Sequence, residues 1–443
     1  MTIFRILLAV VLSFAVVSRS AHIHSRDSND VPIIDLGYAK YQGVFDSLNN
    51  ITNYLGIRYA APPTGQAPQT PTNNNGAVQQ ANAAPLQCFQ AENGFAPANP
   101  LETINKRQSV PAQTEDCLFL NTYFPGDTVP TEPLPVLVFI HGGGYVSGRA
   151  VPHGGSDIMT EAHNKIVLVI IQYRLGLFGS EIKENGDLNA GLLDQDFALR
   201  WVQSHISKFG GDPTKVTIWG ESAANSLACL RFVDANTLGT INANIILGGL
   251  LWNLPVHTSK SLKQGKVNGS NPMNASVYAS MLFPKFGPQQ AELTAQLYAD
   301  LGTPLEQNNL IMGVFLKGLL IEKRTAIFVC PTFYLLSAFP GSSWKIPHGP
   351  TGTIRFAGPP SFNNTEFLEA FQGGFMAFVV SQNPNGKVAP TITPSWERYS
   401  KAHTEIIFNK TVTNEPDVRA TPIDNGQLSR CGFWESVGVL TGQ

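Results

Sequence analysis

The stretch GDLNAGLLDQDFALRWVQSHISKFGGDPTKVTIWGESA at residues 186–223 decides the fold of this chain. Apolar side chains recur at helical spacing from Leu192 to Phe209, and the pair Gly210-Gly211 then stops the helix. The run VTIW at 216–219 follows after the short segment DPTK at 212–215 and is typical of a strand that is buried on both faces. The stretch therefore predicts a helix followed by a buried strand.

Two similar apolar runs lie upstream, VLVFI at 136–140 and IVLVII at 166–171. A strand, a helix and a second strand in this order form a parallel crossover unit. We therefore predict an α/β fold with a mostly parallel central sheet and helices on both of its faces. Further helices are predicted directly after Ser222 and at 292–302 and 366–381, and no repeat or shift in composition marks a second domain.

Two candidate catalytic segments follow predicted strands. Ser222 lies in GESAA, between a strand and a helix, where a tight turn exposes its hydroxyl and points the N-terminus of the helix towards it. The segment His141-Gly142-Gly143-Gly144-Tyr145 follows another strand, and consecutive glycines let backbone N–H groups approach a developing oxyanion. The pair predicts a serine hydrolase.

These segments resemble the type B carboxylesterases, the family of fungal secreted lipases and cholinesterases. The matching stretches are GIRYAAPPTG (56–65), TEDCLFLN (114–121), PVLVFIHGGGY (135–145), YRLGLFG (173–179), residues 186–223 and FWESVGVLTG (433–442). The resemblance implies an α/β-hydrolase fold, a carboxylic ester as the substrate, either a small molecule or a lipid, and no metal or organic cofactor.

The resemblance also assigns roles to individual residues. Ser222 would be the nucleophile, and the N–H groups of Gly143, Gly144 and Ala223 would form the oxyanion hole. Cys88–Cys117 would be the disulfide that ties the loop covering the gorge. Arg58 and Glu115 match a buried structural ion pair of the family.

The base must follow the serine in the chain order of this fold, which leaves His257, His348 and His403. We favour His348 because its His-Gly pair in WKIPHGPTG resembles the catalytic-histidine turn of the family; the alternative is an exposed loop histidine. No catalytic acid is identified, since the Asn-x-x-acid-Gly turn of the family is absent between Ser222 and His348. The acidic residues of that interval, none of which has such a turn, are Asp234, Glu292, Asp300, Glu306 and Glu322.

The gap in the triad leaves two hypotheses for the activity. Apparent excisions near 269–270 and an apparent insertion at 314–324 are what mispredicted exon boundaries would leave, so a functional esterase can underlie the sequence. The alternative is a diverged, catalytically impaired cholinesterase-like module that keeps the fold without efficient turnover. Phe371, Phe375 and Phe378 recur at helical spacing and are predicted to be core residues, whereas Tyr145 and Trp219 flank the predicted site.

The N-terminus and the cysteines indicate secretion. Arg5, an apolar run at 6–17 and small residues at 18–20 predict a signal peptide over residues 1–20, followed by one domain over 21–443, and the run is too short to span a bilayer. Cys88 and Cys117 can close a loop in an oxidising compartment, whereas the apolar surroundings of the other three cysteines predict buried thiols. Those three are Cys229, Cys330 and Cys431. N-glycosylation sequons begin at Asn50, Asn268, Asn274, Asn363 and Asn409.

Composition narrows the classes of partner. The chain has 443 residues, of which 14% are charged, with a net charge of −2 and no long basic run. Such a chain has no electrostatic footprint for a phosphate backbone, so we expect no nucleic-acid partner. No CxxC or HExxH spacing suggests a metal site, and the sequence sets no oligomeric state.

Overall fold

The computed structural model describes part of the chain. The described residues are 31–63, 66–74, 76–90, 112–143, 145, 147–150, 153–180, 187, 189–220, 274–283, 285–304, 307, 311, 330, 333, 336, 343–345, 362–387 and 390–441. They all belong to the unit Val31–Gln443, and the predicted signal peptide, residues 1–20, lies outside them. The same holds for the helix predicted after Ser222 and for Cys229.

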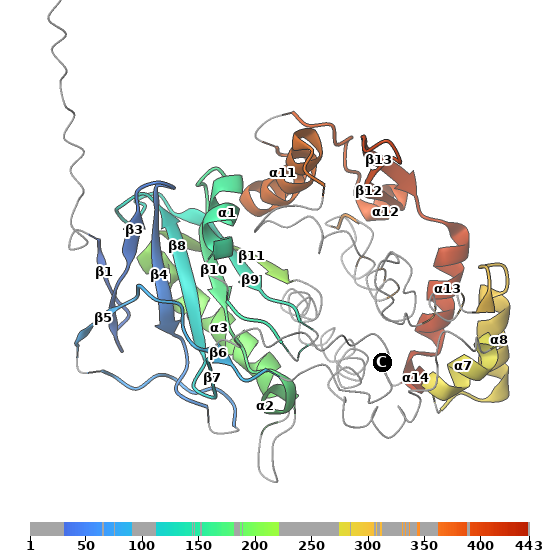
Figure 1. Ribbon diagram of the computed structural model, residues 1–443, viewed down its shortest axis with the longest axis horizontal. Helices are drawn as coiled ribbons and strands as arrows, with labels where there is room; N and C mark the ends of the chain where they lie inside the picture. The colour runs from blue at the N-terminus through green and yellow to red at the C-terminus, as the bar shows by residue number, and fades with distance from the viewer. Residues whose placement is uncertain are drawn as a thin grey trace, which may run out of the picture. The chain divides into compact units, whose positions relative to one another are not determined.

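The described elements alternate between strands and helices in the central part of the chain (Figure 1). The strands are β1 (Ile33–Asp35), β2 (Lys40–Gln42), β3 (Val44–Asp46), β4 (Ile51–Arg58), β5 (Val78–Gln80), β6 (Gln87–Cys88), β7 (Gln113–Thr114), β8 (Phe119–Pro125), β9 (Leu134–Ile140), β10 (Val167–Ile171), β11 (Gly211–Gly220), β12 (Thr404–Lys410) and β13 (Pro416–Pro422). The helices are α1 (His153–Glu161), α2 (Gly176–Ser180), α3 (Ala190–His205), α7 (Ala275–Leu282), α8 (Pro288–Tyr298), α11 (Thr365–Ser381), α12 (Tyr399–Ala402), α13 (Asn425–Ser436) and α14 (Gly438–Thr441).

The main sheet contains the three strands predicted from apolar runs. Its order is β11-β9-β10-β8-β4-β3. β9 pairs in parallel with β10 on one side and with β11 on the other, while β8, β4 and β3 continue the sheet with antiparallel pairings. Over the described residues the sheet is therefore mixed, with its parallel part formed by β11, β9 and β10.

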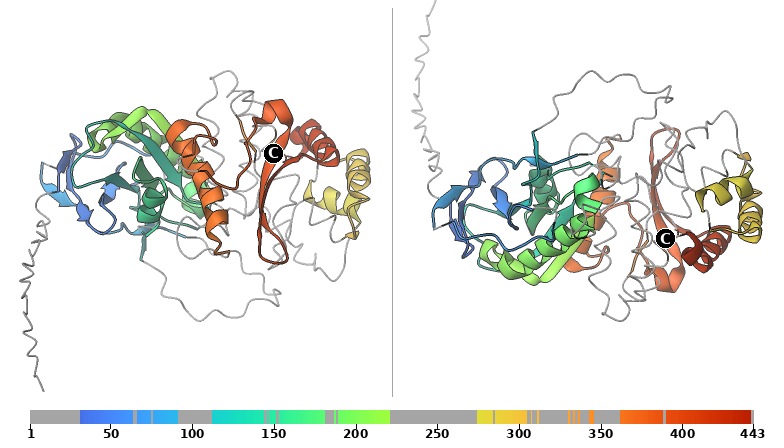
Figure 2. Two further views of the ribbon diagram at one scale, coloured as in Figure 1. Left: turned by 90° about the horizontal axis from the view of Figure 1, so that it is seen from above. Right: turned by 90° about the horizontal axis from the view of Figure 1, so that it is seen from below.

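Helices cover both faces of this sheet. Along β9, Val136, Val138 and Ile140 belong to one core cluster, whereas Leu137 belongs to another, because successive side chains of a strand point to opposite faces. The first cluster includes side chains of α3, and the second includes side chains of α1 and α11. Figure 2 shows α1 and α3 on opposite sides of the strands.

The helix predicted from Leu192 onwards is confirmed, with its end at the predicted glycines. The α-helix α3 tightens into a 3₁₀ turn at Ile206–Phe209, and Gly210 adopts a left-handed φ of 76°. A residue with a side chain is strained in this conformation, so the glycine allows the chain to leave the helix and enter β11.

The C-terminal part contains two smaller clusters. α11, which lies where a helix was predicted, packs Phe367 and Phe371 against the hairpin β12–β13. In the other cluster, α7, α8 and α13 pack around Tyr298 and Trp434. The indole N–H of Trp434 donates to the hydroxyl of Tyr298 over 2.9 Å.

This second cluster contains a disulfide that corrects a prediction. Cys330 and Cys431 form a disulfide and are not free thiols. Their apolar surroundings predicted burial correctly, since their exposures are 0% and 3%, but the partners are 101 positions apart and local sequence does not indicate which distant elements meet. The Cys88–Cys117 disulfide is also present.

Candidate active site

The ends of β9 and β11 define the candidate site. These strands pair in parallel with Gly220 opposite Ile140, the last residue of each strand. The carboxyl ends of parallel neighbours open at the same edge of a sheet, where ligands bind in open α/β folds. His141-Gly142-Gly143 leaves one end, and the segment that carries Ser222 leaves the other.

Several predicted site residues lie outside the described residues. These are Ser222, Gly144, Ala223 and His348, and with them the histidine His257 and the acids Asp234, Glu306 and Glu322. Gly143 is the one predicted oxyanion-hole residue that the structure describes, and Tyr145 and Trp219, predicted to flank the site, are also described. His403 caps the end of α12 with a left-handed φ of 47°.

We call residues 141–148 the glycine loop, and among its described residues Ser147 binds back to Gly143. Gly143 has a φ of +110°, and its carbonyl accepts hydrogen bonds from the N–H and the hydroxyl of Ser147 at 3.0 and 3.2 Å. A Cβ on Gly143 would lie 2.0 Å from the carbonyl oxygen of Ser147. The fold of the loop therefore requires glycine at this position.

His141 forms the buried base of the glycine loop. Its ring stacks on Tyr173 with centroids 4.5 Å apart, and the Tyr173 hydroxyl donates to the His141 carbonyl over 2.7 Å. Nδ1 lies 2.9 Å from the Gly142 carbonyl, so it carries the proton, and Nε2 makes no hydrogen bond to any described residue. Burial lowers the pKa of His141 to about 4, since the charged ring would lose its hydration.

The lowered pKa of His141 predicts a loss of stability in acid. The unfolded chain binds this proton near pH 6.5 and the folded chain only near pH 4, so the contribution is complete above pH 6.5 and is lost as the pH falls towards 4. A shift of this size corresponds to about 3 kcal/mol. Urea unfolding of wild type and His141→Asn at a series of pH values should show a steeper acid decline in wild type; equal slopes would contradict the burial of the ring.

Gly148 closes the glycine loop against His141. It has a φ of +125°, and a Cβ there would lie 2.2 Å from Nδ1 of His141 and 2.5 Å from the carbonyl oxygen of Gly142. We expect Gly148→Ala to lower the free energy of unfolding by about 2–3 kcal/mol, because strain at positive φ adds to the collision.

Gly37 provides a matched control for Gly148. It also has a positive φ, +89°, but no atom lies within 4 Å of a Cβ built on it. Gly37→Ala should therefore show only the conformational cost of about 1 kcal/mol. Urea unfolding of both variants checks the prediction, and equal losses would show that Gly148 has free space around it.

A buried ion pair fixes the chain beside the loop. Asp194 of α3 accepts from Nε and Nη2 of Arg174 at 2.7 and 2.6 Å and from its backbone N–H at 3.0 Å. The two side chains are 1% and 0% exposed. Burial raises the pKa of Asp194, and the guanidinium acts against that rise. Sequence reasoning missed this pair, since the match to YRLGLFG gives no partner for its arginine.

The predicted pair Arg58–Glu115 is wrong in its partner. Arg58 instead binds Asp116 with two hydrogen bonds of 2.6 and 2.8 Å, and the side chains are 25% and 40% exposed, so the pair is not buried. The guanidinium lies over the ring of Phe119, which pairs with Arg58 between β4 and β8. A shift of one residue turns a side chain to the other face of an extended chain, and matching the motif did not fix that register.

The tryptophan and the phenylalanines for which roles were predicted lie on α11 and on the sheet face that α11 covers. Trp219 packs edge-on against Phe139 at 5.4 Å and stacks on Phe375 at 5.7 Å. Phe371 is fully buried, whereas Phe378 is 36% exposed. The core prediction is therefore confirmed for Phe371 and Phe375 and wrong for Phe378.

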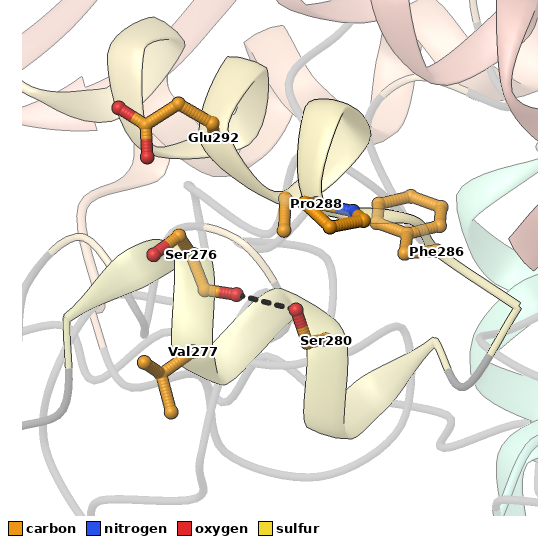
Figure 3. Close-up of a pocket in the computed structure, with 7 residues that line it drawn as sticks. Ser276, Val277, Ser280, Phe286, Pro288 and Glu292 are labelled. Carbon is orange, nitrogen blue, oxygen red and sulfur yellow. Dashed lines mark hydrogen bonds between the residues drawn. The ribbon is translucent and has the colours of Figure 1, made fainter.

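A pocket of about 370 Å³ between α7 and α8 is not this site (Figure 3). Ser276, Ser280 and Glu292 are its polar lining residues. The Ser280 hydroxyl donates to the Ser276 carbonyl over 3.0 Å, and the Ser276 hydroxyl to Asn274 over 2.9 Å. The described residues that line the pocket include no histidine that could act as a base for acyl transfer.

The described part of the chain has neither a metal-binding cluster nor a membrane-spanning helix. It contains no cluster of three or more His, Cys, Asp or Glu side chains that could hold a metal ion. Within the same part, no helix combines the length and apolarity needed to cross a bilayer.

Comparison with known proteins agrees with this geometry. The model of the Carboxylesterase family matches residues 30–270, more than half of the chain. The crystal structure of Aspergillus niger EstA superposes with a TM-score of 0.69 and 23% identity, covering 94% of this chain and 100% of that one. The predicted α/β-hydrolase fold is confirmed. The chain belongs to the carboxylesterase family, type B.

The alignments to two curated relatives cover only part of each relative's length. Carboxylesterase 1E of Mus musculus is 43% identical over 202 residues, which cover 43% of this chain and 35% of that protein. Liver carboxylesterase 1 of Oryctolagus cuniculus is 34% identical over 312 residues, which cover 67% of this chain and 55% of that protein. The chain thus spans between about a third and about half of the length of these relatives.

Proposed function

We propose that this chain is a secreted serine esterase that cleaves carboxylic esters, of small molecules or lipids, through an acyl-enzyme. The observation that carries the proposal is the pairing of Ile140 with Gly220, which brings the starts of both catalytic segments to one edge of the sheet. Membership in the carboxylesterase family supports the same reaction class.

In the proposed reaction, the hydroxyl oxygen of Ser222 attacks the ester carbonyl while His348 takes its proton. The N–H groups of Gly143, Gly144 and Ala223 receive the negative charge that develops on the carbonyl oxygen. The alcohol leaves with the proton from His348, and water then releases the acid by the same steps. No metal or organic cofactor takes part.

The triad acid stays unassigned. Of the acidic residues between Ser222 and His348, the described Glu292 and Asp300 are both exposed, in and just after α8. This supports the prediction that they are solvated surface residues. The second candidate function, a catalytically impaired module with the same fold, is favoured by this gap, because loss of the acid in other serine hydrolases costs on the order of 10⁴-fold in turnover.

Secretion is supported by covalent and surface features. Two disulfides are present, and such bonds persist in oxidising compartments. The sequon asparagines that the structure describes, Asn50, Asn274, Asn363 and Asn409, are all exposed. We accordingly propose a signal peptide over residues 1–20 and a single mature domain over 21–443.

The test is to express the full chain and expose it to a fluorophosphonate, which labels activated serines, and to p-nitrophenyl esters. Labelling of the peptide that contains Ser222, together with ester turnover, supports the esterase. A folded chain that is neither labelled nor active would overturn the proposal and favour the impaired module. Sequencing the transcript across codons 269–270 and 314–324 tests separately whether a strand and an acid turn have been omitted.

A further inference from the structure

Gln90 binds the glycine loop from a distant part of the chain. Its Oε1 accepts from the Gly148 N–H at 2.6 Å, and its Nε2 donates to the Gly148 carbonyl at 3.0 Å. The same Nε2 donates to the carbonyl of Cys88 at 2.7 Å. One amide side chain thus binds both polar groups of Gly148, 58 positions away in the sequence.

The amide of Gln90 has a single satisfactory orientation. An N–H group can bind only its oxygen, and two carbonyls can bind only its nitrogen. Exchanging the two ends would place the amide oxygen against two carbonyl oxygens and the amide nitrogen against an N–H. The three hydrogen bonds therefore fix the orientation of the side chain as well as its position.

The backbone of Gln90 is itself held. It lies two residues after Cys88, which ends β6 and forms a disulfide with Cys117. β6 pairs in parallel with β7, and the N–H of Gln90 donates to Oε1 of Gln113 in β7 at 3.0 Å. The neighbouring Phe89 stacks on Phe178 of α2 with centroids 5.0 Å apart. The backbone segment that carries Gln90 is therefore held by a disulfide, a hydrogen bond and an aromatic contact.

The constraint reaches Gly143 through one residue. Ser147, adjacent to Gly148, donates its N–H and its hydroxyl to the Gly143 carbonyl. Because a peptide unit is planar, a carbonyl that is held in place orients its whole peptide unit. On the other side, the Tyr145 carbonyl accepts from the Gly176 N–H at 2.6 Å, so the loop is held at both Tyr145 and Gly148.

We propose that Gln90 is a positioning residue of the reaction, which clamps Gly148 and thereby holds the glycine loop in the geometry that receives the oxyanion. The inference rests on the proposed function for its catalytic consequence and on the hydrogen bonds of Gly148 for the clamp itself. The inference also gives the Cys88–Cys117 disulfide an indirect role in the reaction, because that bond holds the backbone segment that carries Gln90.

The experiment uses Gln90→Met, which keeps the length of the side chain without its hydrogen bonds, in the full chain. We expect kcat for p-nitrophenyl butyrate to fall about tenfold to a hundredfold with KM within about twofold, because a misplaced oxyanion donor acts on the transition state. Amide hydrogen exchange in peptides covering residues 141–148 should accelerate at least about tenfold, since the Gly148 N–H loses its acceptor.

Gln90→Glu supplies a readout that a purely structural role would not move. The carboxylate cannot donate to the Gly148 or Cys88 carbonyl, but the protonated acid, with its one O–H, can donate to one of them. The ratio of its kcat to that of wild type should therefore rise as the pH is lowered from 7 to 5. A constant ratio would contradict the clamp.

Gln307→Ala is the matched control. Its Nε2 also donates to two backbone carbonyls, those of Ala299 and Gly302 at 3.1 and 3.0 Å, and it leaves the glycine loop untouched. It should change neither kcat nor exchange at 141–148. Unchanged exchange in Gln90→Met, or a rise in KM without a fall in kcat, would overturn the inference. If wild type hydrolyses no ester, the proposed function fails, and the exchange measurement alone still decides the clamp.

Discussion

Replacing Ser222 with alanine should remove ester turnover by an amount that reports whether the triad is complete. In a serine hydrolase with a full triad, loss of the serine costs about 2 × 10⁶-fold in kcat, while loss of the acid alone costs about 3 × 10⁴-fold. A chain without a functional acid has already lost the second factor. Removing its serine then costs only their quotient, on the order of 10²-fold.

The measurement is kcat for a p-nitrophenyl ester in wild type and Ser222→Ala, with fluorophosphonate labelling of both. Ser204→Ala is the control, because this serine of α3 is exposed and its hydroxyl donates to the Arg200 carbonyl on the same helix. A fall near 10⁶-fold means that a substitute acid is present, and one near 10²-fold supports the impaired module. Equal turnover in wild type and Ser222→Ala would refute Ser222 as the nucleophile.

The parallel half of the sheet could be predicted from sequence because it is coded locally. The runs at 136–140, 166–171 and 216–219 are apolar on both faces, and the helix at 190–205 shows one apolar face and a glycine stop. Residues 61–116 gave no such signal. The structure places β5, β6 and β7 there, and strands of two or three residues are too short to show a period.

The part of the candidate site that lies in one continuous segment of the chain could be predicted from the sequence. The glycines at 142–144 predicted a loop whose backbone can approach an oxyanion closely, and Gly143 has a φ of +110°, which favours glycine. The groups that fix this loop come from elsewhere: the ring of Tyr173, the amide of Gln90 and the N–H of Gly176. Non-local contacts of this kind follow from the packing of the whole sheet, so residue types alone did not indicate them.

Asp194→Ala should lower the free energy of unfolding by about 3–5 kcal/mol, the largest loss of stability that we expect from a single substitution among the described residues. The substitution leaves the Arg174 guanidinium, 1% exposed, without its two hydrogen bonds to this carboxylate, and the Arg174 backbone N–H without its one. An unpaired buried charge is costly because neither water nor a counter-ion replaces the lost partner. Urea unfolding followed by tryptophan fluorescence measures the loss.

Asp196→Ala is the matched control on the same helix. Asp196 pairs with Arg200 one turn along, but those side chains are 37% and 64% exposed, and such surface pairs contribute about 0.3–0.5 kcal/mol. A loss below about 1 kcal/mol in Asp194→Ala would mean that water reaches Arg174. The double variant Asp194→Leu, Arg174→Met should recover most of the loss, because replacing both charges with apolar groups leaves none unpaired.

The consequence of the Asp194 substitution should extend to the glycine loop. Arg174 follows Tyr173, the residue that stacks on His141 and donates to its carbonyl. A Cβ on Gly191 of α3 would lie 2.5 Å from the Arg174 carbonyl oxygen, so helix and strand end approach as closely as a glycine allows. The ion pair holds this junction, and we therefore expect kcat to fall in Asp194→Ala even in dilute buffer at low temperature, where the chain is still folded. Unchanged kcat under those conditions would mean that the base of the loop is fixed by the tyrosine contacts alone.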